Sequence, residues 1–461
     1  MLTPQDRNQP PAPEPAAIAG SGGLGLAVAA LTAVRVGSVA AGFLTSVLGA
    51  RLIGPAGLGV AGAAITIATI GALVANGGIN IATIYLLGRR PEERAVIVGR
   101  VAVLAIVAVV LAAFGVLAAG AALRESVLGG APLDLLLATA GLGAGTLLFE
   151  LGGGTLLGLH RRSAYIVIQV VEAVAALVLT AVILLAVSRT ATGFLAAAAL
   201  GYWLGAAVAL AHVVRGLGPI RLSYAPAFTR ELLAIGARGQ VGNVLQFLNL
   251  RLDLLLVPAL LNLSAAGVYL VAVRVSEVIT QVSSSAAAFL FPHVAAQEER
   301  RNPTATERAA RMTLLVVLVG GLPLFILAEL LLGLAFGPEF AGGATTLRIM
   351  LVAMLPLSIV RLMAGDLKGR GRPGLVSIAA LVAVLATIAF DLLLIPLLGI
   401  EGAALASLLT YTTSAIVLLA VYRRETDGSL VALVPGWPDV RELARLGIRA
   451  MRARGGRGAT S

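Results

Sequence analysis

The feature that most constrains this chain is a succession of apolar runs that recur along almost its whole length. A run of roughly 18 residues or more crosses the hydrocarbon core of a bilayer, about 30 Å thick, as an α-helix. Hydrophobic residues make up 59% of the 461 residues and charged residues only 12%, with a mean hydropathy of +0.97. A soluble domain carries about 25% charged residues. These values exclude a soluble enzyme and place most of the chain in lipid.

The pattern within the runs favours helices over a β-barrel. Barrel strands alternate apolar and polar residues over about ten positions, whereas these runs are continuous and rich in Ala, Leu and Gly. We therefore predict an all-α polytopic membrane protein with about twelve transmembrane helices. The expected spans are 24–50, 58–88, 95–122, 133–158, 164–187 and 194–214 in the first half, and 234–261, 267–296, 310–336, 344–367, 374–397 and 400–422 in the second.

Arginine and lysine gather in every second loop, and the loops between them hold few cations. By the positive-inside rule, both termini are expected in the cytoplasm, with the chain in the inner (plasma) membrane. The formal net charge of +11 follows from this topology and does not require a nucleic acid partner. The basic loops contain Arg89, Arg90, Arg94, Arg161, Arg162, Arg215, Arg221, Arg230, Arg300, Arg301, Arg308, Lys368, Arg370, Arg372, Arg423 and Arg424.

The two halves resemble each other at an offset of roughly 209 residues. Gly59 opens the second span as Gly267 opens the eighth, and Gly193–Tyr202 matches Gly402–Tyr411 at the same spacing. Because each half has an even number of spans, both halves share one orientation. We therefore expect two six-helix bundles related by a pseudo-twofold axis along the membrane normal, with a cleft between them.

Both ends of the chain are expected outside the membrane. Four prolines between positions 10 and 15 argue against an apolar signal core, so the first residues are interpreted as a disordered tail. Near the other end, arginines follow one stripe of a short candidate helix, a pattern suited to anionic headgroups. The expected parts are a cytoplasmic tail (1–23), a six-helix bundle (24–214), a cytoplasmic linker (215–231), a second bundle (232–424) and a cytoplasmic tail with a basic amphipathic helix (425–461).

Several ionisable residues lie inside the expected spans, where each costs about 2.5–3.5 kcal/mol unless it is paired or hydrated. A structural ion-pair cluster between the seventh and eighth spans would explain four of them. Alternatively, the surplus of cations suits an anionic diphosphate headgroup. The cationic candidates are Arg35, Arg251, Arg274 and Arg361, and the acids beside them are Asp253 and Glu277.

Three further acids stand singly in their spans, namely Glu150, Glu172 and Asp391. Such a carboxyl group can be protonated in the membrane or bind a coupling ion. Asn76 and Asn80 lie one helical turn apart in the second span. They form a polar face that either packs against a neighbouring helix or lines the cavity.

The chain offers no residues for catalysis or for a cofactor. It contains no cysteine, no phosphate-binding loop and no G-x-S-x-G motif. His160, His212 and His293 are too dispersed in sequence for a zinc motif. We therefore expect neither an enzyme nor a metalloprotein.

The turn Arg51-Leu-Ile-Gly-Pro-Ala-Gly-Leu-Gly59 resembles the R-x-L-G-P-x-x-x-G turn of the polysaccharide and O-antigen flippases, which belong to the multidrug/oligosaccharidyl-lipid/polysaccharide superfamily. The likeness continues at Gly267-Val-Tyr269, at Phe291-Pro292 and at Gly399-Ile-Glu-Gly-Ala-Ala404. In this order the motifs cover nearly all of residues 24–424.

The resemblance implies a V-shaped cavity that opens alternately and a polyprenyl-diphosphate-linked oligosaccharide as substrate. It also implies membrane lipids, glycosyltransferases and a polymerase of the same pathway as partners. The lipid II flippases are similar but usually have fourteen spans. Two alternatives stay open: a cation-coupled multidrug or metabolite exporter of the same superfamily, and a non-transporting scaffold, polymerase or ligase. The short extracytoplasmic loops disfavour an enzyme.

Overall fold

The computed structural model describes residues 21–296, 302–443 and 445, among which there are helices and no strand. Nine of the described helices are long and apolar enough to cross a membrane, or ten if the bent pair α9 and α10 forms one span. The first half contains α1 (Ser21–Asn76), α2 (Ile79–Arg89), α3 (Arg94–Ala122), α4 (Leu133–Gly158), α5 (Arg162–Val182) and α6 (Ala191–Leu217). The second contains α7 (Pro226–Arg251), α8 (Asp253–Leu260), α9 (Leu263–Glu277), α10 (Thr280–Ala295), α11 (Thr304–Ile326), α12 (Ala328–Leu331), α13 (Ala344–Gly369) and α14 (Pro373–Glu425).

The two longest helices, α1 and α14, each contain two of the expected spans. The backbone of α1 breaks at Gly54, with φ 68°, and that of α14 breaks at Gly399, with φ 63°. Side chains other than glycine rarely adopt such positive φ values, so glycine permits both turns without a long loop. With these breaks and the bent α9–α10 pair, all twelve expected spans lie in helices. The predicted polytopic all-α fold is confirmed.

The observed helix bounds differ from the expected spans in several places, among them the break at Leu252 between α7 and α8. The second span is interrupted at Gly77 and Gly78, which both have positive φ, so α2 is a separate helix. The helix α7 begins at Pro226, inside the stretch expected to be a linker, because proline suits the first turn of a helix. The predicted N-terminal tail lies outside the described residues up to position 20, and α1 starts at Ser21.

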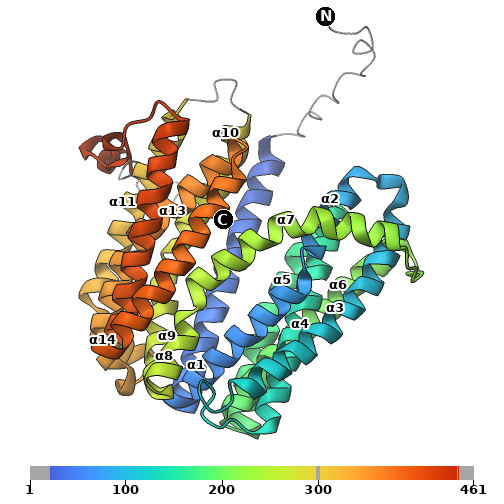
Figure 1. Ribbon diagram of the computed structural model, residues 1–461, viewed down its shortest axis with the longest axis horizontal. Helices are drawn as coiled ribbons and strands as arrows, with labels where there is room; N and C mark the ends of the chain where they lie inside the picture. The colour runs from blue at the N-terminus through green and yellow to red at the C-terminus, as the bar shows by residue number, and fades with distance from the viewer. Residues whose placement is uncertain (1–20, 297–301, 444, 446–461) are drawn as a thin grey trace, which may run out of the picture.

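Two groups of helices diverge toward one end of the molecule (Figure 1). One group contains α2 to α6, and the other contains α10, α11, α13 and α14. The helix α7 crosses between the two groups, and it packs against both α2 and α14. We call the end that carries the arginine-rich loops after α2, α4 and α13 the basic end, and the other the opposite end.

The buried apolar side chains explain this divergence. One core cluster combines residues of both halves, such as Leu58 and Phe194 with Tyr269 and Leu347. A second cluster lies within the α2–α6 group and takes in Phe228 and Leu232 from the start of α7. A third belongs to the other group. Apolar packing therefore joins the halves in one region and holds each group together separately elsewhere.

The joined region is the opposite end, where α1 and α9 approach each other through glycine. A Cβ atom added to Gly59 would lie 2.0 Å from the carbonyl oxygen of Leu263, and one added to Gly267 would lie 1.9 Å from that of Pro55. The two contacts are reciprocal: each half presents a glycine to the backbone of the other. Since a methyl group fits at neither position, the close approach requires glycine at both.

We expect Gly59→Ala to loosen this contact and to lower the stability of the described conformation by about 1–3 kcal/mol, as overpacking does in protein cores. Thermal unfolding of the purified protein in detergent measures the effect. The matched control is Gly115→Ala in α3, where the added methyl group meets nothing within 4 Å. Equal stability of the two variants would contradict the predicted closure.

The segment after α14 folds back onto α11 at the basic end. The Arg311 side chain donates to the Asp439 carboxylate at 3.1 Å and to the carbonyl oxygen of Ala432 at 2.6 Å. Residues 437–443 form a short helix, in which the Arg441 guanidinium lies 5.8 Å from the centre of the Trp437 ring. The expected basic helix runs from Asp439 to about Arg454, and most of it, from residue 446 on, lies outside the described residues. Its role at the membrane surface stays a prediction.

We expect this attachment to depend on pH. The backbone N–H of Gly436 and the Arg311 guanidinium hold the pKa of Asp439 below its usual range. The ionised carboxylate therefore stabilises the attachment above the ordinary carboxyl pKa, and this stabilisation is lost as the pH falls through the lowered value. Hydrogen–deuterium exchange of residues 430–440, corrected for the intrinsic effect of pH, measures it.

Arg311→Ala is expected to raise exchange in that segment at neutral pH as well. The control is Arg372→Ala, which removes a separate ion pair with Glu425 at the end of α14. Unchanged protection in Arg311→Ala would show that the ion pair does not hold the segment.

Candidate functional site

Two cavities lie on either side of α7, near the basic end. The larger, of about 460 Å³, is lined by α1, α2, α4, α5, α6 and α7, and we call it the N-side cavity. The smaller, of about 230 Å³, is lined mainly by α7, α13 and α14, and we call it the C-side cavity. Asn243 of α7 lines both. Because α1 and α9 close the opposite end, both cavities belong to the side on which the groups diverge.

The N-side cavity contains an acid and several amides. The Asn76 side-chain amide donates to the Glu150 carboxylate at 3.3 Å, and the Asn76 side-chain oxygen accepts the backbone N–H of Asn80 at 3.1 Å. Asn80 packs against Gly154 of α4. The sequence left open whether Asn76 and Asn80 pack against a neighbouring helix or line a cavity. In the structure they contact α4 and also line the N-side cavity. Glu150 is the acid among the lining residues, and none of them is Lys or Arg.

The C-side cavity has the reverse polarity. Arg361 and Lys368 line it, and no acid is among its lining residues. The Arg361 guanidinium donates to the Thr280 carbonyl oxygen at 2.9 Å and to the Ser284 hydroxyl at 2.6 Å. These neutral acceptors position Arg361 without neutralising its charge, so that the cation remains available to an anion.

Next to this cavity, the predicted charges of the seventh and eighth spans come together in part. The Arg251 guanidinium forms an ion pair with Glu277 at 2.9 Å, and both side chains are 19% exposed. Arg274 is exposed, and it donates no hydrogen bond to a described residue. Arg251 and Arg361, like Arg274, lie within electrostatic range of Glu277. Three cations therefore share this carboxylate.

The four charges come together only in part, because Asp253 lies within electrostatic range of Arg251 and Glu277 but forms its hydrogen bonds elsewhere. Asp253 is buried and accepts a hydrogen bond from the Tyr269 hydroxyl at 2.5 Å and one from the backbone N–H of Leu254. Side chains two residues apart on a helix differ in direction by about 200°, so Arg251 and Asp253 point to different neighbours. The Asp253 carboxylate therefore makes its hydrogen bonds to Tyr269 and Leu254 rather than to an arginine of the cluster.

The remaining candidates lie apart from this cluster. Asp391 of α14 is fully buried, and neither of its carboxylate oxygens has a hydrogen-bond partner among the described residues. It lies within electrostatic range of Asp253. Glu172 of α5 is half-buried and interacts electrostatically with Tyr202, which lines the N-side cavity. The side chain of Arg35 is outside the described part of α1.

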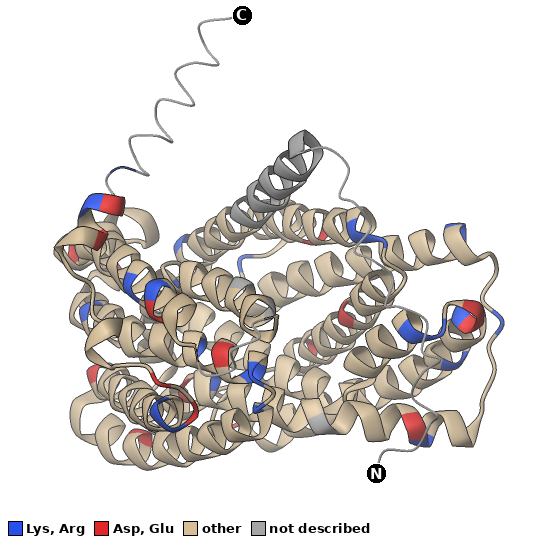
Figure 2. Ribbon diagram, turned by 90° about the horizontal axis from the view of Figure 1, so that it is seen from above, with Lys and Arg blue, Asp and Glu red and all other residues tan. Residues whose placement is uncertain are grey.

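Figure 2 views the molecule from above relative to Figure 1, and it shows how unevenly charge is distributed. Most of the ribbon is uncharged, and many Lys and Arg residues lie toward the edges of the view. A few charged positions also appear among the helices in the middle. Since charge inside a membrane protein is costly, we expect the charged residues at these inner positions to have a functional role.

Four amides of α7 were not among the sequence candidates, namely Gln240, Asn243, Gln246 and Asn249. All four approach the cavities: Gln240 lines the N-side cavity, Asn243 both, and the other two the C-side cavity. The signal in the sequence is their regular three-residue spacing within an apolar helix. The series carries no charge, so the ionisable residues of the seventh span, Arg251 and Asp253, do not point to it.

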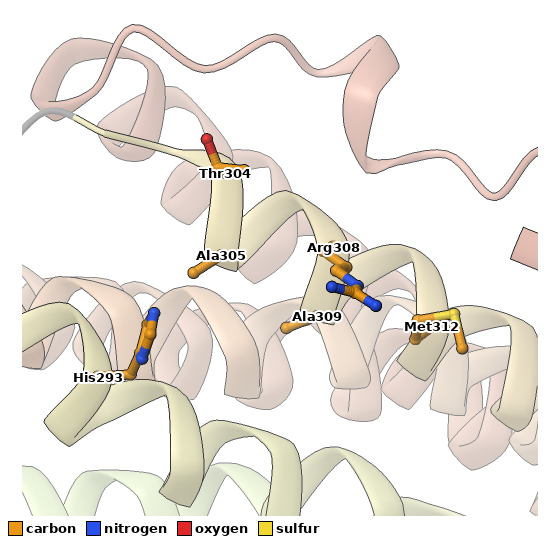
Figure 3. A pocket seen from close by; sticks show the side chains of 6 residues that line it. All are labelled: His293, Thr304, Ala305, Arg308, Ala309 and Met312. Atoms are coloured by element: carbon orange, nitrogen blue, oxygen red, sulfur yellow. The ribbon is translucent and has the colours of Figure 1, made fainter. Parts of the chain in front are cut away.

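A further hollow of about 530 Å³ lies at the basic end, between the last turn of α10 and the first turns of α11 (Figure 3). Its lining includes His293 from α10 and Arg308 from α11, whose side chains are shown in the figure. Arg308 also pairs with Glu442 of the C-terminal segment. This hollow shares no residue with the two cavities beside α7.

Known proteins resemble this chain in sequence and in fold. A stretch of 170 residues is 25% identical to the probable low-salt glycan biosynthesis flippase Agl15 of Haloferax volcanii, and it covers 36% of each protein. The chain thus spans about a third of that relative. An inward-facing multidrug resistance MATE family transporter of the MOP superfamily matches with a TM-score of 0.68 and 16% identity, over 83% of this chain and 93% of that one. The lipid II flippase MurJ, in an inward closed conformation, matches with a TM-score of 0.70 and 14% identity, over 85% of this chain and 87% of that one.

At these identities the two solved structures establish the fold alone. The sequence itself establishes the family, because residues 26–298, more than half of the chain, match the sequence profile of the polysaccharide biosynthesis protein family. The resemblance noted in the motifs is thereby confirmed. This multi-pass membrane protein belongs to the polysaccharide biosynthesis protein family and has the fold of the MOP superfamily transporters.

Proposed function

We propose that this protein is a flippase that moves a polyprenyl-diphosphate-linked oligosaccharide from the cytoplasmic leaflet to the outer leaflet. The observation that carries the proposal is the C-side cavity, which holds Arg361 and Lys368 without a lining acid. It lies on the diverging side of a molecule whose opposite end is closed between Gly59 and Gly267. Alternating access then requires the closed end to open as the basic end closes.

A diphosphate suits this charge distribution. Guanidinium groups in a low-dielectric site are stabilised by a phosphate that accepts several hydrogen bonds. Arg361 lines the C-side cavity and Arg274 lies within electrostatic range of Tyr202 in the N-side cavity, and neither forms an ion pair with a described residue, whereas Arg251 is engaged by Glu277. We assign Arg274 and Arg361 to the diphosphate and Arg251 to their positioning. Arg35 stays a candidate for the same role.

The single acids are candidates for coupling transport to an ion gradient. An unpartnered buried carboxylate such as that of Asp391 is unfavourable unless it is protonated or binds a cation. Asp253, which lies within electrostatic range, would share that proton or cation. Glu150 and Glu172 are further candidates to bind a proton or a coupling cation near the N-side cavity.

The topology expected from the loop charges supports a direction of transport. If the basic end faces the cytoplasm, the cavities receive a lipid from the leaflet in which polyprenyl-linked sugars are assembled, and both termini are cytoplasmic. The plasma membrane is the expected location. Glycosyltransferases that complete the glycan, and a polymerase that uses it outside, are the expected pathway partners.

A second candidate function is export of a cationic drug or metabolite. The observation that favours it is the N-side cavity, whose lining includes Glu150 and no Lys or Arg. The basic C-side cavity favours an anion instead, and it adjoins the cluster of three arginines. We therefore place the flippase first.

In a strain that lacks this protein, complete oligosaccharide-lipids are expected to accumulate on the cytoplasmic side. Mass spectrometry of polyprenyl-linked intermediates, with sidedness tested in intact spheroplasts, measures this. Accumulation identifies the cargo. An unchanged pool would contradict the flippase and favour the exporter.

Arg274→Ala and Arg361→Ala are each expected to reduce transport about tenfold or more, since a lost charge-assisted hydrogen bond costs about 1.5–3 kcal/mol. Complementation of the deletion strain measures this at matched protein levels in the membrane. The matched control is Arg348→Ala, whose guanidinium donates to the Phe325 carbonyl oxygen outside both cavities. Full transport by both Arg274→Ala and Arg361→Ala would contradict the assignment.

Asp391→Asn is expected to abolish any stimulation of transport by a proton or sodium gradient, while substrate binding is kept, because the amide cannot exchange a proton or hold a cation by charge. Transport into proteoliposomes with and without each gradient measures it. Glu329→Gln, which changes an exposed acid of α12, serves as the control. A gradient response retained in Asp391→Asn would rule out this coupling role.

A further inference from the structure

The four amides of α7 form a regular series. Gln240, Asn243, Gln246 and Asn249 follow one another at three-residue steps. Each residue of an α-helix turns the side-chain direction by about 100°, so a three-residue step falls about 60° short of a full turn. Four such positions sweep about half of the helix circumference. The series therefore starts on one face of α7 and ends on nearly the opposite face.

The two outer members of the series are structural. The Gln240 side-chain amide donates to the carbonyl oxygen of Leu73, in α1, at 2.5 Å. At the other end, the Thr387 hydroxyl of α14 donates to the side-chain oxygen of Asn249 at 3.0 Å. These hydrogen bonds fix one end of the series to the first half of the molecule and the other end to the second half.

The two inner members are free. Asn243 and Gln246 are both exposed, and neither forms a hydrogen bond with a described residue. Asn243 lines both cavities, and Gln246 lines the C-side cavity. Amides that merely join transmembrane helices are paired across the interface, as Gln240 and Asn249 are. The inner pair instead presents unused donors and acceptors to the space between the halves.

From this arrangement we propose that Asn243 and Gln246 bind the glycan of the lipid-linked substrate, along a track for sugar hydroxyls that joins the two cavities. This inference rests on the proposed flippase function. A side-chain amide carries two donors and an acceptor, so it can match hydroxyl groups that both donate and accept. The neutral amides suit sugar hydroxyls, and Arg274 and Arg361 take the diphosphate. Recognition of the glycan thus resides in α7, apart from the cationic groups.

Two probes separate the glycan site from the diphosphate site. One is polyprenyl diphosphate without sugar, and the other is the oligosaccharide-lipid fraction extracted from the deletion strain. Binding of each to the purified full-length protein is measured by native mass spectrometry. We expect the double variant Asn243→Ala/Gln246→Ala to bind the oligosaccharide-lipid about tenfold more weakly, for two lost hydrogen bonds. Its binding of polyprenyl diphosphate should stay within about twofold of wild type.

The controls test whether the amide group itself is responsible. Asn243→Gln/Gln246→Asn keeps both amides and is expected to recover much of the oligosaccharide-lipid binding. Val241→Asn adds an amide to the same helix outside both cavities, and it should change neither affinity. Arg274→Ala should weaken both probes, because both carry the diphosphate.

The result that overturns this inference is an alanine double variant that binds the oligosaccharide-lipid as wild type does, or that loses both probes equally. Failure of the proposed function has a different signature. Wild-type protein would then bind neither probe, and the deletion strain would accumulate no oligosaccharide-lipid.

Discussion

The reciprocal glycine contact between α1 and α9 is the constraint on which the rest of the structure depends. Each half places a glycine, Gly59 or Gly267, against a backbone carbonyl of the other. Such an approach buries the two helices against each other without long side chains, so the largest apolar cluster forms there and joins the halves. Away from this contact each group of helices has its own core. The groups can therefore separate at the basic end without exposing a shared core.

Where the two groups of helices separate, polar side chains line the N-side and C-side cavities, which are closed off at the opposite end. The two cavities differ in charge. Glu150 stands on the N-side, with Arg361 and Lys368 on the C-side. A folded core would pair such charges, because an isolated charge in a low dielectric is costly. Keeping them on opposite sides of α7 preserves two chemically distinct environments. A molecule with an anionic head and a neutral polar portion matches such a division better than a uniformly charged one does.

Much of the fold could be predicted from the sequence, because hydropathy and loop charge follow directly from the bilayer as solvent. The twelve spans and the paired landmarks Gly59 and Gly267 belong to this part. Which charges meet depends on helix rotation and tilt. Thus Arg251 pairs with Glu277, whereas Asp253, two residues farther on, turns to Tyr269. The break at Gly77–Gly78 was also missed, since an apolar run does not report the local φ of a glycine.

The position of α7 has a mechanical consequence. Its Gly236 lies so close to Gly78, the residue before α2, that a Cβ atom on either glycine would overlap the backbone of the other, and its far end continues into α8 beside α9. A helix of 26 residues, about 39 Å long at 1.5 Å per residue, hardly stretches. It acts as a strut of fixed length between the two bundles. Any rocking motion of the bundles must bend or rotate α7. The length of α7 therefore limits how far the two bundles can separate at the basic end, and with it the size of the substrate that can pass.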